Sequence, residues 1–276
     1  MENLNEDQVR QAVRENYAKV VKSDGCDCGC NSGEPVSLQM VKTSCCSGSD
    51  NPVKERPAQD STRMGYSADD LANVPQGSDM GLGCGNPQAI AALKAGETVL
   101  DLGSGGGFDS FLAANQVGTK GHVIGVDMTP EMVSKARENA ARNDYHNVEF
   151  RLGEIEHLPV ADNDVDVILS NCVINLSPDK LSVYREAFRI LKPGGRLAIS
   201  DMVAVSELPD ELKRNLDCYC GCITGTIPAD EIKRMLAEAG FQDISIEFKD
   251  ESREFVTEGF PAKASKTTSF RLPSKR

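Results

Sequence analysis

Apolar segments of strand length alternate with segments of helix length through the middle of the chain. Runs such as ETVLDLG (97–103) and DVDVILS (164–170) are apolar at most positions, which is typical of strands buried on both faces. FDSFLAANQV (108–117) has the length and periodicity of a short helix. Strands separated by helices predict an α/β fold, in which a parallel sheet is covered by helices on both faces. The expected strands span residues 97–103, 121–127, 147–153, 164–170 and 195–200.

Proline and its neighbours mark the ends of two further helices. Thr129 is placed to cap a helix whose first residue is Pro130, a position that tolerates the missing N–H of proline. A second helix is expected from residue 177 to residue 191, where the Pro-Gly-Gly at 193–195 would stop it.

The pattern changes on both sides of this region. Residues 6–22 predict a helix with Val9, Val13, Tyr17 and Val20 near one face. Residues 23–62 are rich in Gly, Ser, Cys and Pro, and we expect a mobile segment there.

The C-terminal part has a different rhythm. A helix is expected from residue 228 to residue 239, ended by Gly240 and followed by FQDISIEFKD. The tail 261–276 is basic and polar, and we assign it no structure. The chain therefore divides into three expected parts: a helix with a Cys-rich segment (1–75), the α/β core (76–203) and a small substrate-binding region with a polar tail (204–276).

The chain of 276 residues carries a formal charge of −12 at pH 7, which argues against nucleic acid or an anionic membrane as the main partner. No apolar run approaches the roughly 18 residues of a membrane span. The N-terminal MENLNEDQVR lacks a basic and then apolar signal. We expect a cytoplasmic protein that acts as a monomer.

Ten cysteines are unusual in such a protein. In a reducing compartment, clustered thiols more often bind metals or take part in redox chemistry than form structural disulfides. The chain has only three histidines, so ligand sites here would be made of sulfur. The cysteines are at positions 26, 28, 30, 45, 46, 84, 172, 218, 220 and 222.

A glycine-rich loop joins the first expected strand to its helix. VLDLGSGGGFD contains Gly103, Gly105 and Gly107, and a dinucleotide fingerprint would place its third glycine one residue later. Asp127 ends the second strand, 20 residues after Gly107, where a carboxylate can bind both ribose hydroxyls. Glu154, after the third strand, is placed to accept a hydrogen bond from an adenine amino group.

These motifs resemble the seven-strand class I methyltransferases that use S-adenosylmethionine, over roughly residues 85–202. The resemblance implies a Rossmann-like fold, in which the glycine loop holds the amino-acid end of the cofactor and an acid like Asp101 faces its ammonium. The acid after the second strand would hold the ribose, and Met128 would lie against the adenine, unless it is ordinary core. The cofactor-binding residues expected on this basis are Asp101, Gly103, Ser104, Gly105, Gly107, Asp127, Met128, Glu154, Ile155 and Asn171.

Cys172 lies immediately beyond the fourth strand, where ligands of parallel sheets bind. It is either a substrate ligand or a small buried apolar side chain. Cys84, in GLGCGNP, and Cys222, in GCITG, belong to loops that can reach the same end of the sheet. Three thiolates would suit trivalent arsenic, which is three-coordinate and keeps a nucleophilic lone pair, whereas zinc normally takes four ligands.

The runs MGYSADDLANVPQGSDMGLGCGNP, SNCVINL and GCITG resemble the arsenite methyltransferases. The resemblance implies that Cys84, Cys172 and Cys222 bind As(III), and that the substrates are arsenite and methylated arsenicals. It also matches Cys45 and Cys46 to a thiol pair for redox exchange, reset by thioredoxin or glutathione. The roles of Cys26, Cys28, Cys30, Cys218 and Cys220 stay open.

Three alternatives remain at this point. The chain could methylate another small carbon, oxygen or nitrogen acceptor and use its cysteines structurally. It could also bind or sense metalloids through thiolates on a methyltransferase scaffold. A zinc ribbon at the N-terminus is disfavoured by the irregular cysteine spacing.

Overall fold

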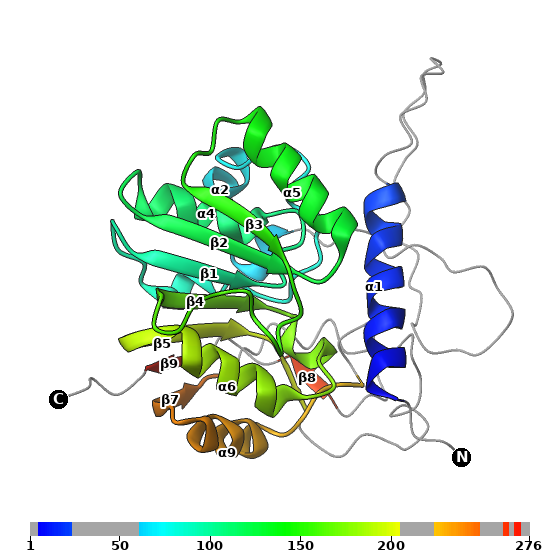
Figure 1. Ribbon diagram of the computed structural model, residues 1–276, viewed down its shortest axis with the longest axis vertical. Helices are drawn as coiled ribbons and strands as arrows, with labels where there is room; N and C mark the ends of the chain where they lie inside the picture. Colours follow the sequence, from blue (N-terminus) through cyan, green and yellow to red (C-terminus); the bar gives the residue numbers. More distant parts are fainter. Residues whose placement is uncertain (1–4, 24–60, 205–223, 249–261, 265–267, 272–276) are drawn as a thin grey trace, which may run out of the picture.

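The computed structural model describes residues 5–23, 61–204 and 224–248, and the backbone of two short strands at 262–264 and 268–271. It is built on one seven-stranded sheet with a separate two-stranded ribbon (Figure 1). The strands are β1 (Thr98–Leu102), β2 (His122–Asp127), β3 (Val148–Leu152), β4 (Val165–Asn171), β5 (Leu191–Ser200), β6 (Met202–Ala204), β7 (Gln242–Ile246), β8 (Ala262–Ala264) and β9 (Thr268–Arg271).

The main sheet has the strand order β3-β2-β1-β4-β5-β9-β7. Strands β1 to β5 are paired in parallel, whereas β9 is antiparallel to both β5 and β7. The parallel strands therefore bring their carboxyl ends to one edge of the sheet, where α/β proteins place their ligands.

Helices cover both faces of the sheet. They are α1 (Glu6–Ser23), α2 (Ala68–Ala72), α3 (Gln88–Ala91), α4 (Phe108–Val117), α5 (Pro130–Arg142), α6 (Lys180–Ile190) and α9 (Ala229–Ala239), with short 3-10 turns at Ser61–Met64 and Ile174–Leu176. Leu100 and Ile168 pack with α6 and α9, whereas Val99, Val167 and Leu169 pack with α3 and α4. Alternate strand residues point to opposite faces, which is why both sets are apolar.

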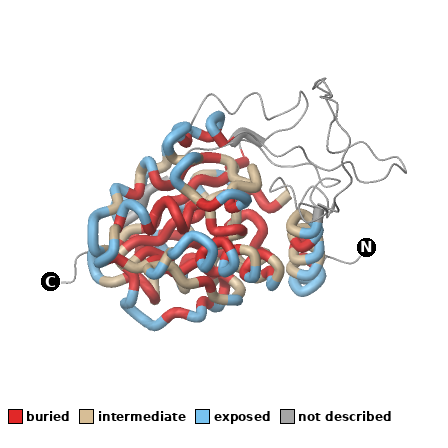
Figure 2. Tube along the Cα trace, turned by 90° about the horizontal axis from the view of Figure 1, so that it is seen from above, coloured by how far each residue is buried: buried red, intermediate tan, exposed pale blue. Residues whose placement is uncertain are grey.

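The first helix lies at the carboxyl ends of the parallel strands (Figure 1). It contacts α5 and buries Val9 and Val13 against Cys172 and Leu176. Its outer side stays exposed (Figure 2). The expected helix at 6–22 is confirmed, and its apolar face helps to wall the edge of the sheet where the site forms.

The predicted elements of the core agree closely with the structure. The helix at 108–117 has the bounds predicted for it, the strand predicted at 121–127 begins one residue later, and the strand predicted at 164–170 is shifted by one residue. The helix expected from residue 177 begins later, at Lys180, because Asp179 caps it by accepting a hydrogen bond from the Ser182 N–H. Its Pro-Gly-Gly is not a helix stop but part of β5, which starts at Leu191.

The prediction that residues 261–276 have no secondary structure is wrong for residues 262–264 and 268–271, which form β8 and β9. Strand β9 lies between β5 and β7 in the main sheet, and β8 pairs with β6. The tail is polar and has no apolar alternation, so its strands depend on backbone hydrogen bonds from partners distant in sequence. The sheet thus crosses the expected boundary at residue 203, and the C-terminal part completes the core.

Several residues of interest fall outside the described ranges. They are Cys26, Cys28, Cys30, Cys45, Cys46, Cys218, Cys220 and Cys222. Within the described ranges, no helix has both the length and the apolarity to cross a bilayer.

Removing residues 262–276 tests the role of the tail strands. We expect this truncation to lower the melting temperature by about 10 °C or more, since it takes a strand from between β5 and β7 and opens an apolar sheet edge. Thermal unfolding followed by circular dichroism measures the change. Deleting only residues 272–276 is the matched control, and an equal melting temperature for both truncations would contradict the assignment.

Candidate active site

The glycine loop between β1 and α4 brings backbone close to the cavity. Gly103 has φ +64°, and a Cβ there would come within 2.4 Å of the Val173 side chain. Gly105 has φ +51° and faces open space, with only the Met132 sulfur at 4.0 Å from an added Cβ. Positive φ favours glycine, and the space beside Gly105 lets a ligand approach the main chain.

Asp127 holds this loop at the end of β2. Its carboxylate accepts hydrogen bonds from the Gly105 N–H at 3.0 Å and the Thr129 N–H at 2.8 Å. Desolvation raises the pKa of Asp127, and these hydrogen bonds oppose the rise. Thr129 is the N-cap residue of α5 as predicted, but its side chain makes no capping hydrogen bond to the helix. Asp127 therefore organises the turn that Thr129 was expected to organise.

Two buried carboxylates lie between the glycine loop and β4. Asp101, in β1, accepts a hydrogen bond from the Ser110 hydroxyl at 2.6 Å, and Asp109, in α4, accepts one from the Tyr66 hydroxyl at 2.7 Å. Burial raises the pKa of Asp101 well above its usual value, and the neighbouring Asp109 adds to the rise. No described Lys, Arg or His forms an ion pair with either acid, so a cationic ligand would be favoured here.

The Asn171 amide connects these acids to the loop that carries Cys84. Its Nδ2 donates to Asp109 Oδ2 at 3.1 Å and to the Gly85 carbonyl at 2.9 Å. Its Oδ1 accepts from the Cys84 N–H at 3.0 Å. Asn171 is thus the link that sets the Cys84 loop against the end of β4.

The structure brings Cys84 and Cys172 together. Both bond to Ser200, whose carbonyl accepts from the Cys172 N–H at 2.8 Å and the Cys84 thiol at 3.4 Å. The two sulfurs and a carboxylate oxygen of Asp201 all lie within 4.8 Å of one another. Cys172 also has φ +58°, a strained conformation for a residue other than glycine and one that is concentrated at functional sites.

Asp201 is a buried acid directly after β5. It accepts hydrogen bonds from Asn175 Nδ2 at 2.7 Å and from the Met202 N–H at 2.8 Å. Burial raises the pKa of Asp201 to about 6, against the effect of those hydrogen bonds and of the Lys180 charge. Sequence reasoning missed this residue, although its position after a parallel strand is the same signal that identified Asp127.

Glu154 does not face the cavity as expected for an adenine ligand. It forms ion pairs with Arg10 at 3.7 Å and with Arg14 at 3.2 Å, both on α1. Its neighbours Ile155 and Glu156 line the cavity instead. The acidic segment after β3 therefore fastens α1 over the site, a role that no local sequence pattern indicated.

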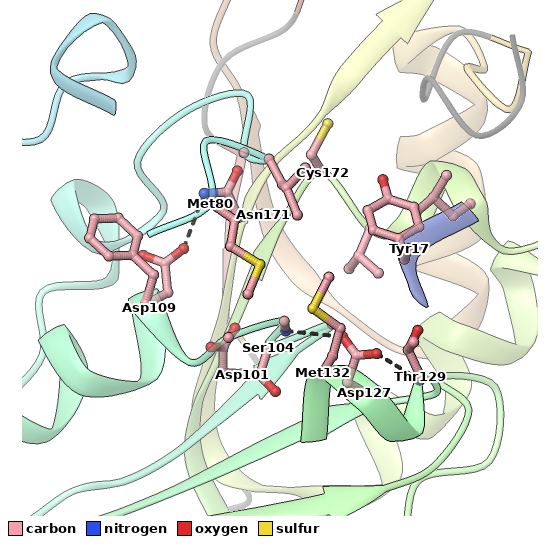
Figure 3. A pocket seen from close by; sticks show the side chains of 18 of the residues that line it. Tyr17, Met80, Asp101, Ser104, Asp109, Asp127, Thr129, Met132, Asn171 and Cys172 are labelled. Carbon is pink, nitrogen blue, oxygen red and sulfur yellow. Dashed lines mark hydrogen bonds between the residues drawn. The ribbon is translucent and has the colours of Figure 1, made fainter. Parts of the chain in front are cut away.

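These groups surround one cavity, shown in Figure 3 with Asp101, Ser104 and Asp127 along one wall and Cys172 and Tyr17 on the other. The Ser104 hydroxyl is buried and has no hydrogen-bond partner among the described residues, so it is available to a ligand. Of the expected site residues, the cavity is lined by Asp101, Gly103, Ser104, Gly105, Asp127, Met128, Ile155, Asn171 and Cys172. Cys84 adjoins it through Cys172, and Gly107, the N-cap residue of α4, is not among the lining residues. Tyr66 and Asp109 line the cavity and were not expected from the sequence.

Comparisons with known proteins agree with this arrangement. A family model described as a methyltransferase domain matches residues 93–240. The crystal structure of an arsenic(III) S-adenosylmethionine methyltransferase from Chlamydomonas reinhardtii is 32% identical, with a TM-score of 0.56 over 80% of this chain and 75% of that chain.

The chain belongs to the arsenite methyltransferase family. Another relative, the arsenite methyltransferase of Halobacterium salinarum, is 54% identical over 91% of this chain. The family member from Aquipseudomonas alcaligenes is 38% identical over 85% of this chain. The chain spans 62% of the length of each of these two relatives.

The predicted Rossmann-like class I methyltransferase fold is confirmed. The cavity lies at the carboxyl ends of its parallel strands, where α/β proteins bind their ligands. The structure adds how this edge is built. Asp101 and Asp109 are buried near the glycine loop. The thiols of Cys84 and Cys172 lie beyond the end of β4, the strand next to β1.

The cost of the buried acids can be measured. Because folding raises the pKa of Asp101, its charged form destabilises the folded protein. This destabilisation is absent at a pH where the carboxyl is protonated in both the folded and the unfolded protein. It grows as the pH rises from about 4, the pKa in the unfolded chain, toward the pKa in the folded protein. We expect Asp101→Asn to raise the free energy of unfolding of the ligand-free protein by about 2 kcal/mol at pH 8 and by less at pH 5. Urea denaturation at both pH values provides the measurement.

Asp166→Asn is the matched control, because Asp166 pairs with Lys192 at 2.8 Å at the far end of the sheet. That substitution should not stabilise the protein. A gain for Asp101→Asn that is the same at both pH values would show that Asp101 carries no burial penalty.

Proposed function

We propose that this protein transfers a methyl group from S-adenosylmethionine to trivalent arsenic held by cysteine thiolates, as a step in arsenic detoxification. The observation that carries the proposal is the pair of thiols, Cys84 and Cys172, beside an acid-lined cavity at the carboxyl ends of the parallel strands. The names of the family members support arsenite as the substrate.

The cavity residues fit the cofactor at its amino-acid and ribose ends. Asp101 and Asp109 are buried without a cationic partner among the described side chains, which suits the ammonium. Asp127 can accept hydrogen bonds from ribose hydroxyls, and the unpartnered Ser104 hydroxyl lies beside the loop. The cofactor supplies an electrophilic methyl group on a sulfonium.

We assign the adenine contacts to Met128 and Ile155, which line the cavity near α1. Glu154 is engaged by Arg10 and Arg14, so we give it the role of holding α1 rather than that of an adenine ligand.

Cys222 is our third arsenic ligand. It precedes the described residue Thr224 by two positions, a reach of about 7 Å in an extended chain. Gly225 lies against Asn175 so closely that a Cβ would come within 1.8 Å of the Asn175 carbonyl oxygen. Asn175 in turn binds Asp201, which adjoins both described thiols. This tether supports the assignment of Cys222 to the same site.

The chemistry needs no base to remove a proton from the nucleophile. Arsenite exchanges each hydroxyl for a cysteine thiol, whose proton leaves with the hydroxyl as water, and the arsenic retains a lone pair. That lone pair forms the As–C bond while the electrons of the C–S bond stay with the cofactor sulfur. The contribution of the chain is to position the arsenic opposite the methyl group.

We expect Cys172→Ser to lower arsenite-dependent consumption of S-adenosylmethionine by at least about 100-fold, because a hydroxyl does not replace a thiolate as an arsenic ligand. Cys84→Ser and Cys222→Ser should have the same effect. Methylarsenicals are measured by chromatography coupled to mass spectrometry, and cofactor binding by calorimetry should be unchanged. Cys220→Ser is the control that should stay active, and an active Cys172→Ser would refute the thiolate site.

We further propose that Cys45 or Cys46 takes part in reduction. Methyl transfer formally oxidises As(III) to As(V), so each further methylation needs two electrons. A pair of thiols can supply them by forming a disulfide and releasing two protons, and thioredoxin or glutathione can reduce that disulfide. A reducing compartment such as the cytoplasm would keep these thiols free.

The double variant Cys45→Ser/Cys46→Ser should retain the first methyl transfer and lose most of the later turnovers. We expect a burst of about one methylarsenical per protein and a steady-state rate at least about 10-fold below that of the unchanged protein. Rapid-quench kinetics with each reductant separates the two phases. Unchanged steady-state turnover and products would remove the redox role of this pair.

A further inference from the structure

A third group stands beside the two thiols, and the chemistry above gives it no role. Asn171 of β4 pairs with Ser200 of β5, so the residues that follow them, Cys172 and Asp201, leave adjacent strands side by side. A carboxylate oxygen of Asp201 lies within 4.8 Å of both the Cys84 and the Cys172 sulfur.

The hydrogen bonds of Asp201 favour the carboxylate over the neutral acid. Its oxygens accept from the Asn175 N–H at 3.2 Å, from Asn175 Nδ2 at 2.7 Å and from the Met202 N–H at 2.8 Å. All three partners are N–H donors and cannot accept a proton in return. The positive charge of Lys180 also acts on Asp201. These contacts oppose the effect of burial and favour a negative charge beside the thiols.

A negative charge in this place does not help to form free thiolates. A neighbouring anion disfavours ionisation of a thiol, so Asp201 opposes the activation of Cys84 and Cys172 as nucleophiles. It does help any species in which positive charge appears between the two sulfurs. The reaction assigned to this site generates such a charge.

We propose that Asp201 is a further catalytic residue, whose carboxylate stabilises the positive charge that develops on arsenic as the methyl group is transferred. This inference rests on the proposed function. In the ground state the arsenic trithiolate is neutral and the sulfonium carries the charge. As the As–C bond forms and the C–S bond breaks, the sulfur becomes neutral and the charge passes to arsenic.

Such an arrangement accelerates the reaction because it acts differently on the two states. The carboxylate interacts weakly with neutral arsenic and strongly with the cationic centre, so the transition state gains more than the bound substrate. The carboxylate is buried and is held by at least the three hydrogen bonds named above, which strengthens the interaction and avoids reorganisation.

The test is Asp201→Asn, which keeps the shape of the side chain and removes its charge. We expect a roughly 100-fold lower single-turnover rate of arsenite methylation at saturating substrate, the lower end of the effect of removing one preorganised charge-stabilising group. The dissociation constant for arsenite, measured by equilibrium dialysis and elemental mass spectrometry, should change by less than about 3-fold. Asp201→Glu should recover part of the rate.

Controls separate this role from a structural one. Asp166→Asn makes the same change at the amino end of β4, where Asp166 bonds the Thr98 N–H and Lys192, and should leave the rate unaltered. Asp201→Ser provides a second neutral variant in case the asparagine protein does not fold. Circular dichroism and cofactor calorimetry establish that the variants are intact.

The outcomes are distinct. A normal methylation rate in Asp201→Asn, with arsenite methylation intact in the unchanged protein, overturns the role of Asp201 and leaves the proposed function standing. Loss of arsenite binding in that variant would make Asp201 a ligand and also overturn the inference. No arsenite-dependent methylation by the unchanged protein would overturn the proposed function itself, and this inference with it.

Discussion

The register between β4 and β5 is the constraint on which the site depends. Because Asn171 lies opposite Ser200, the next residue of each strand projects beyond the same edge of the sheet. The Ser200 carbonyl then accepts hydrogen bonds from both Cys172 and Cys84. A shift of one residue would turn every side chain of the strand to the other face and separate the thiols from Asp201.

The same edge concentrates negative charge. Asp101 and Asp109 are both buried near the glycine loop, and Asp201 is buried near the thiols. In the ligand-free protein these acids oppose folding, since burial raises the pKa of each of them. A cationic donor at one end and a developing cation at the other would compensate them. The buried acids at this edge of the sheet therefore lower the stability of the ligand-free protein and favour ligand binding and catalysis.

The N-terminal helix closes the cavity by means of charge and apolar contact together. Val13 and Tyr17 of α1 line the cavity, and Arg10 forms ion pairs with Glu154 and Glu156. Glu156 is buried and also accepts a hydrogen bond from the Ser177 hydroxyl at 2.6 Å. The helix is thus a wall of the site rather than a separate extension.

The sequence by itself determined the sheet core, the glycine loop and the acid after β2, since these are written in local periodicity and in short motifs. It also pointed to Cys172, through its place after a parallel strand. Only the tertiary structure decided that Glu154 pairs with α1, that a polar tail supplies the strand between β5 and β7, and that Asp201 joins the thiols. Each of these depends on partners distant along the chain, and neither composition nor periodicity carries information about which distant residues will meet.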